Sequence, residues 1–190
     1  MKKLAWLALL SASLPVVHGC AAVAVGGAAT AAVVADDRRM ASVVILDQEI
    51  ELHAYDRLNK AFGDKPVSVS TVSFNRKVLV VGQVPDETSR KKVEEIVKSI
   101  PEVREVHNET VISGVSSLTS DANDTAITTK VKARLLDSDK VSANHVKVVT
   151  ETATVYLMGL VTRDEGEAAA RIAASTSGVK SVVKLFEYID

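Results

Sequence analysis

The sequence predicts an α+β fold in which one α-β-β-α-β unit occurs twice in tandem. The first observation is an internal repeat, because Val78-Leu-Val-Val-Gly82-Gln-Val84 returns as Val155-Tyr-Leu-Met-Gly159-Leu-Val161. Repetition of this kind indicates duplicated domains. The second observation is that short valine-rich runs alternate with amphipathic, helix-like segments. We therefore expect two small domains, each with its helices packed on one face of a small mixed sheet.

Each unit opens with a predicted helix. Asp47 is the expected N-cap of the first helix, and Asp124 or Thr125 that of the second, because a short side chain with an oxygen acceptor favours this position. Both helices carry apolar residues at helical spacing that should face the core. These residues are Ile50, Ala54, Leu58, Ala61 and Phe62 in the first helix and Ile127, Val131 and Leu135 in the second.

A hairpin of two valine-rich strands, a second helix and a closing strand complete each unit. We expect the first hairpin to turn over residues 74–77 and the second to have a tighter turn over residues 151–153. The second helix of the first unit has the amphipathic spacing, with Val93, Ile96, Val97 and Ile100 at i, i+3, i+4 and i+7. Its counterpart begins at Thr162-Arg-Asp-Glu165, which matches a capping box.

Gly82 and Gly159 occupy the same place in the two copies, inside a predicted strand. Glycine in a strand marks a bulge or the close approach of another backbone or ligand. We interpret both as structural glycines, at a bulge or where a helix packs tightly on the strand. The alternative is a backbone surface that approaches a ligand.

The chain divides into five predicted segments. Apart from the two domains there is a leader, a tether that ends in the charged run Asp36-Asp37-Arg38-Arg39, and a short polar linker. We interpret the charged run as a solvated part of the tether, with partner binding as the alternative. The segments are residues 1–19, a signal peptide; 20–45, the tether; 46–113, domain 1; 114–122, the linker; and 123–190, domain 2.

Cys20 is the only cysteine, and it directly follows the apolar leader. The leader has Lys2 and Lys3 and then a leucine- and alanine-rich stretch, which is the pattern of a signal peptide. The run Val17-His-Gly-Cys20 resembles the lipobox of bacterial lipoproteins, which implies that Cys20 is acylated and anchors the chain to a membrane. Several acyl chains together anchor stably, whereas one does not. The alternatives are a transmembrane segment that runs past Cys20 and a buried free thiol.

Composition argues against several functional classes. The formal net charge is −1, which does not indicate a nucleic-acid-binding protein. A single cysteine leaves no pair for a disulfide, a redox site or a thiolate metal site. The histidines His53, His107 and His145 are scattered, and no nucleophile elbow or phosphate loop is present. We expect no catalytic site, no metal and no cofactor, and therefore no enzyme.

The repeated pattern, with Gly82 and Gly159 after apolar strands and valines returning downstream, resembles the BON domain. With the lipobox and the run Asn123-Asp-Thr-Ala-Ile-Thr-Thr-Lys-Val131, the whole chain is similar to the dual BON-domain outer-membrane lipoproteins of Gram-negative bacteria. The resemblance implies a periplasm-facing protein of the outer membrane, and Ala21 after the cysteine agrees with export there. It also implies a role in outer-membrane integrity, binding of anionic phospholipid by the first helix of domain 2, and a link to the β-barrel assembly machinery.

The candidate lipid-binding residues are Ala126, Lys130, Ala133 and Arg134, which share one face of that helix. The family commonly has tryptophan where Ala126 stands, and alanine provides less of an interfacial anchor. Lys130 and Arg134 are four residues apart and therefore neighbours, and each cation near an anionic bilayer contributes about 1 kcal/mol. An acyl anchor would make such weak contacts effective. The alternative is a solvated basic face without a ligand.

Two other functions stay open. One is an envelope scaffold that docks on the barrel-assembly machinery or on peptidoglycan and contacts lipid only through its acyl anchor. The other is a small-molecule sensor with a pocket between sheet and helices, although the sequence offers no convergent polar cluster for it.

Overall fold

The computed structural model describes residues 37–63, 67–113 and 118–190. The predicted signal peptide, Cys20 and most of the tether lie outside these residues. Residues 37–190 form a compact unit. Its first half contains α2 (Ala41–Phe62), β1 (Ser68–Phe74), β2 (Lys77–Val84), α3 (Glu87–Lys98), β3 (Glu105–Asn108) and β4 (Val111–Ile112). Its second half contains α4 (Leu118–Leu136), a short 3₁₀ turn (Ala143–His145), β5 (Val146–Glu151), β6 (Thr154–Val161), α5 (Arg163–Ala174) and β7 (Ser181–Tyr188).

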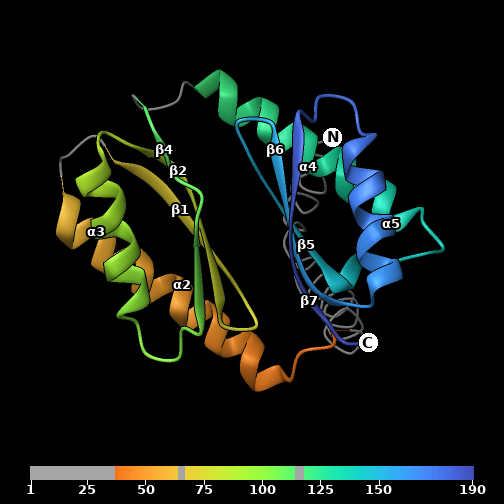
Figure 1. Ribbon diagram of the computed structural model, residues 1–190, viewed down its shortest axis with the longest axis horizontal. Coiled ribbons are helices and arrows are strands. Elements are labelled where there is room, and N and C mark those ends of the chain that lie inside the picture. Colours follow the sequence, from red (N-terminus) through yellow and green to blue (C-terminus); the bar gives the residue numbers. More distant parts are fainter. Residues whose placement is uncertain (1–36, 64–66, 114–117) are drawn as a thin grey trace, which may run out of the picture. The chain divides into compact units, whose positions relative to one another are not determined.

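Each half is an α-β-β-α-β domain, as predicted (Figure 1). In the first, β1 pairs with β2 antiparallel, and β3 and β4 pair with β2 in parallel. In the second, β5 and β6 are antiparallel and β7 joins β6 in parallel. The two helices of each domain bury their apolar stripes against one face of its sheet, which confirms the α+β class. The mixed sheets follow from this order, because the crossover through a helix makes the last strand parallel.

Both first helices begin earlier than predicted. Helix α2 begins at Ala41, inside the predicted tether, and α4 begins at Leu118, inside the predicted linker. The expectation that Asp47 and Asp124 are N-caps is therefore wrong, since both lie within helices. They are also buried, with exposed fractions of 3% and 7%. An acidic residue inside a helix and out of water requires hydrogen-bond partners from elsewhere in the fold.

The partners of these two aspartates are the turns of the neighbouring hairpins. Asp47 accepts hydrogen bonds from the backbone N–H of Asn75 at 2.8 Å and of Arg76 at 2.7 Å. In the second domain, Asp124 accepts them from the backbone N–H groups of the corresponding turn, at 2.7 and 2.8 Å. All four turn residues have positive φ. The second turn is not tighter than the first, because both hairpins have two-residue turns of the kind that suits twisted strands.

Strands β2 and β6 are buried on both faces. Val78 and Val80 of β2 pack against the helices of their own domain. Leu79 and Val81 point to the other face, where they share a cluster with residues of β6. The cluster consists of Phe74, Leu79, Val81, Tyr156 and Met158. The helix-free faces of the two sheets therefore contact each other, and a near-continuous apolar run is what a doubly covered strand requires.

Gly82 and Gly159 lie where two strands come very close. A Cβ atom added to Gly82 would lie 2.1 Å from the carbonyl oxygen of Ser68, and one added to Gly159 would lie 2.3 Å from that of His145. Gly82 also has a φ of +118°, which side chains disfavour. The close neighbour of each glycine is thus a backbone carbonyl of the same domain, and not a helix packed on the strand.

The end of the tether is bound to both domains. Arg38 donates to both carboxylate oxygens of Glu165, at 2.6 and 2.9 Å, in the second domain. Arg39 donates to Asp47 in the first domain at 2.8 Å, and its guanidinium lies 4.0 Å from the ring centre of Phe74. The interpretation of this charged run as a solvated tether is wrong for Arg38 and Arg39. Glu165 is distant from Arg38 in sequence, so the local pattern could not reveal that contact.

This contact predicts an acid-dependent loss of stability. The hydrogen bond from Arg38 is the main cause that lowers the pKa of Glu165 to about 2, below the usual value near 4.3. The stabilisation is complete above the unfolded pKa and is lost as the pH falls through about 2. We expect Arg38→Gln to lower the unfolding free energy by about 1 kcal/mol at pH 7, and by progressively less between pH 4.5 and 2. The measurement is the melting temperature as a function of pH.

The control for this experiment is Lys60→Gln, which removes an exposed i,i+4 pair with Asp56. Such pairs contribute little to stability. A difference in melting temperature between the wild type and Arg38→Gln that stays constant from pH 7 to 2 would contradict the prediction.

Candidate functional site

Helix α4 has one buried face and one face open to solvent. Ile127, Val131 and Leu135 are at most 1% exposed, as their spacing predicts. The candidate residues Ala126, Lys130, Ala133 and Arg134 are all exposed on the outer side of the helix. The fold thus brings the four together on one accessible surface.

Two further residues extend this surface. Leu136, at the end of α4, is 72% exposed, and Lys132 is also exposed. On a helical wheel, Ala126, Ala133 and Leu136 form an uncharged strip with Lys130 on one side and Lys132 on the other. The sequence interpretation missed Lys132 and Leu136, although continuing the same wheel by one turn would have found them.

Arg134 differs from Lys130 in its contacts. Its Nη1 donates to the carbonyl oxygen of Ile172 at 2.9 Å and to the hydroxyl of Thr176 at 2.8 Å. These bonds tie the end of α4 to the end of α5, where a cation also complements the helix dipoles. Arg134 therefore has a structural contact in addition to its place on the outer surface.

The charge of α4 changes sign along its length. Asp121 and Asp124 lie in its first half, and Lys130, Lys132 and Arg134 lie in its second half. Burial is the main cause that raises the pKa of Glu151, which lies near the acidic half, and the charges of Asp124 and Asp121 raise it further. An anion would consequently approach the second half of α4.

Among the residues that the structure describes, no cluster of histidine, cysteine or carboxylate side chains could hold a metal ion. Within the same residues, no helix combines the length and the apolar character that crossing a bilayer requires.

The first helix of domain 1 presents a different surface, which the sequence interpretation missed. Ile45, Leu52 and Tyr55 of α2 are 59%, 66% and 67% exposed. Their spacing places them on one outer stripe of the helix. Each of the corresponding positions of α4 has a smaller or polar residue: Ala122, Thr129 and Lys132. The two copies have thus diverged on their outer faces, and domain 1 carries the apolar one.

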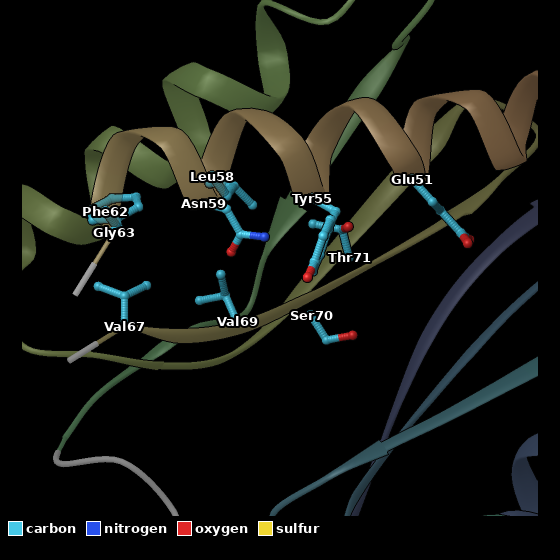
Figure 2. Close-up of a pocket in the computed structure, with 10 residues that line it drawn as sticks. All are labelled: Glu51, Tyr55, Leu58, Asn59, Phe62, Gly63, Val67, Val69, Ser70 and Thr71. Carbon is cyan, nitrogen blue, oxygen red and sulfur yellow. The ribbon is translucent and has the colours of Figure 1, made fainter. Parts of the chain in front are cut away.

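Beside this stripe lies a groove between α2 and strand β1, with a volume of ≈ 320 Å³ (Figure 2). We call it the α2–β1 groove. Its apolar end is lined by Leu58, Phe62, Val67 and Val69. Tyr55 and Glu51 line it toward the other end, as the close-up shows. The groove is open, and the polar side chains of Asn59, Ser70 and Thr71 also line it.

Comparison with known proteins gives consistent matches. A model of the BON domain family matches residues 46–114 and 123–190. The outer membrane lipoprotein DolP of Haemophilus influenzae is 37% identical over 97% of this chain and 96% of its own. The 21 kDa hemolysin of Actinobacillus pleuropneumoniae is 30% identical over 80% of this chain and 79% of its own. Osmotically-inducible protein Y of Escherichia coli is 31% identical over 62% of this chain and 60% of its own.

Proposed function

Because this chain belongs to the dual BON-domain outer-membrane lipoproteins, we propose that it binds anionic phospholipid through α4 and is not an enzyme. In this proposal the acylated Cys20 anchors the chain, which faces the periplasm. The second half of α4 contacts the lipid headgroups, and the protein helps to maintain the integrity of the outer membrane. The exposed basic and uncharged surface of α4 is the observation that supports this function.

The energetics are those of a weak contact made effective by an anchor. Lys130 and Lys132 near an anionic surface would contribute about 1 kcal/mol each. The uncharged strip that ends at Leu136 would let the helix approach the headgroups without burying a charge. An anchored domain meets the membrane at a high effective concentration, so that contacts too weak for a free domain suffice.

The test is binding of the acyl-free chain, residues 21–190, to vesicles with and without anionic phospholipid at low and moderate salt. We expect salt-sensitive binding to anionic vesicles, and its loss in the double variant Lys130→Glu, Arg134→Glu. Because Arg134 also holds α5, the variant Lys130→Glu, Lys132→Glu is measured beside it. The matched control is Lys91→Glu, an exposed residue of α3. The absence of binding at either salt concentration, or an equal loss in the control, would sink the proposal.

A second arm of the same experiment restores the family tryptophan with Ala126→Trp. The only tryptophan of the chain is Trp6, which lies in the predicted signal peptide. The substituted residue is therefore the sole indole in residues 21–190 and reports its own surroundings. We expect binding several-fold tighter than that of the wild type and a blue-shifted emission, because an amphipathic ring favours the headgroup level.

A second candidate function is docking on an envelope protein, such as the barrel-assembly machinery, or on peptidoglycan. The apolar outer stripe of α2 favours a protein partner, because exposed apolar patches mark interaction surfaces. This candidate predicts that residues 21–190 do not bind vesicles, and that substitutions on α2 affect the function in cells while those on α4 do not.

A further inference from the structure

We infer that the α2–β1 groove is a docking site for an extended peptide segment of a partner protein, which adds a strand to β1. The segment would carry an apolar side chain and, four residues away, a lysine or arginine. This inference is independent of lipid binding by α4.

The backbone of β1 is the first basis for the inference. Strand β1 is at the edge of its sheet, because β2 is its only paired neighbour among the described strands. In an antiparallel pair with a two-residue turn, alternate residues direct their N–H and C=O groups toward the partner strand and away from it. Counting from the turn, Val69, Thr71 and Ser73 direct theirs outward. Ser73 confirms this count, because its N–H donates to the carboxylate of Glu51 at 2.8 Å and not to β2.

Glu51 therefore occupies only one end of this edge. Within the described part of the chain, no hydrogen bond satisfies the outward N–H groups of Val69 and Thr71. An extended peptide alongside β1 would pair with them in the way that known β-augmentation complexes do.

The side chains of the groove specify what the peptide must carry. At the level of Val69 the apolar side chains of Leu58 and Phe62 border the groove, and the amide of Asn59 lies beside them (Figure 2). At the other end, the Glu51 carboxylate accepts a hydrogen bond from the backbone N–H of Ser73. A carboxylate has several acceptor sites, so Glu51 can also bind a cationic side chain. Val69 and Ser73 are four residues apart on the same side of the strand, which sets the spacing between the apolar and the cationic side chain of the peptide.

The second domain provides an internal comparison. The groove beside α4 and β5 is lined by threonines, lysines and carboxylates, together with valines of β5 and Val72 of β1. There the hydroxyls of Thr128 and Thr150 are 2.7 Å apart and join the helix to the edge strand. At the positions of Glu51 and Tyr55 the second domain has Thr128 and Lys132. The Glu51 carboxylate and the Tyr55 ring beside the strand edge are thus particular to domain 1 and not a property of the duplicated fold.

The test uses the acyl-free chain, residues 21–190, which contains the whole compact unit. The probe is a soluble peptide of serine and threonine that carries leucine and, four positions later, lysine, together with its reversed sequence. Backbone amide signals are followed by NMR during the titration. We expect one of the two peptides to shift Val69 and Thr71 most strongly. We also expect Glu51→Gln, which keeps an acceptor for Ser73, to weaken binding roughly three- to fivefold.

Two variants separate the backbone from the side chain. Val69→Pro removes an outward N–H without breaking the ladder to β2, which an edge strand tolerates, and it should abolish binding. Val69→Ala keeps the outward N–H and should retain most of the peptide binding. If Val69→Pro does not fold, peptides methylated at the backbone nitrogens of one edge make the same test on the wild type.

Three results would overturn the inference. The first is the absence of shifts at Val69 and Thr71 with either peptide. The second is equal binding of the lysine peptide and of its glutamate counterpart. The third is that vesicles of zwitterionic lipid shift Leu52 and Tyr55 while the peptides do not, which would make this face a membrane contact.

Discussion

Replacing Gly82 with alanine is expected to lower the unfolding free energy by about 4 kcal/mol or more, and to prevent domain 1 from folding at 37 °C. The added Cβ would lie 2.1 Å from the carbonyl oxygen of Ser68, which is backbone and has no rotamer to change. The residue must also keep a φ of +118°, which strains alanine. Relief would require β1 and β2 to separate, which breaks their ladder and opens the core beneath. Gly159→Ala should have a similar effect in domain 2, against the carbonyl oxygen of His145.

The measurement is urea unfolding followed by circular dichroism, with Gly63→Ala as the matched control. Gly63 also has positive φ, at +50°, but nothing lies within 4 Å of an added Cβ. Its substitution should therefore cost only the backbone strain, about 1 to 3 kcal/mol. Equal destabilisation by Gly63→Ala and Gly82→Ala would show that backbone conformation, and not close approach, is the reason for glycine at position 82.

Removing the buried carboxylate of Asp47 is expected to have the second large effect. Asp47→Ala leaves the turn N–H groups of Asn75 and Arg76, the hydroxyl of Ser73 and the guanidinium of Arg39 without this partner. Loss of one member of a buried, charged network costs about 3 to 5 kcal/mol. Asp124→Ala should cost less, about 2 to 3 kcal/mol, because within the described residues Asp124 accepts hydrogen bonds only from the two turn amides.

The same unfolding experiment checks this ranking. Asp56→Ala serves as the control, since Asp56 lies on the same helix but is 53% exposed and pairs with Lys60. It should change the unfolding free energy by less than about 0.5 kcal/mol. If Asp47→Ala lowers the unfolding free energy no more than Asp56→Ala does, the hydrogen bonds from the hairpin turn to Asp47 do not stabilise the fold. Asp47→Asn should lower the unfolding free energy by less than Asp47→Ala does, because the amide oxygen keeps an acceptor although the charge is lost.

The sequence predicted the regular parts of this fold because its repeat and its periodicity are local signals. The stripe of Ile127, Val131 and Leu135 is buried as expected, and the capping box at Thr162 is present. The predicted starts of α2 and α4 were wrong, because an aspartate that caps a helix and one that binds a distant turn look alike in sequence. Asp47 and Asp124 precede their turns by the same interval in both copies, and that interval was the available signal.

The sequence also indicates that β2 and β6 are covered on both faces. In β2 the residues of both faces are apolar, and the same is true of β6, which is typical of strands covered on both sides. What covers the second face does not follow from such a run. The bonds of Arg38 and Arg39 could not be predicted, because Arg38 contacts Glu165 across most of the chain.

For the candidate site, Ala126, Lys130, Ala133 and Arg134 lie on the outer side of α4, as its wheel predicts. The wheel could not show that Arg134 bonds to Ile172 and Thr176, because those partners belong to another helix. The apolar stripe of α2 was missed for a different reason. The family resemblance implies a ligand site in the second copy only, whereas Ile45, Leu52 and Tyr55 form the exposed apolar stripe in the first.

The shared cluster of Leu79, Val81, Tyr156 and Met158 has a consequence for how this protein is assembled at low abundance. A domain with one bare apolar sheet face would ordinarily need a second molecule to cover it, and such a homodimer dissociates on dilution. In this chain both faces belong to one polypeptide, so their effective concentration is set by the connection between the domains and not by expression. The pairing of the two sheets is therefore insensitive to the concentration of the protein.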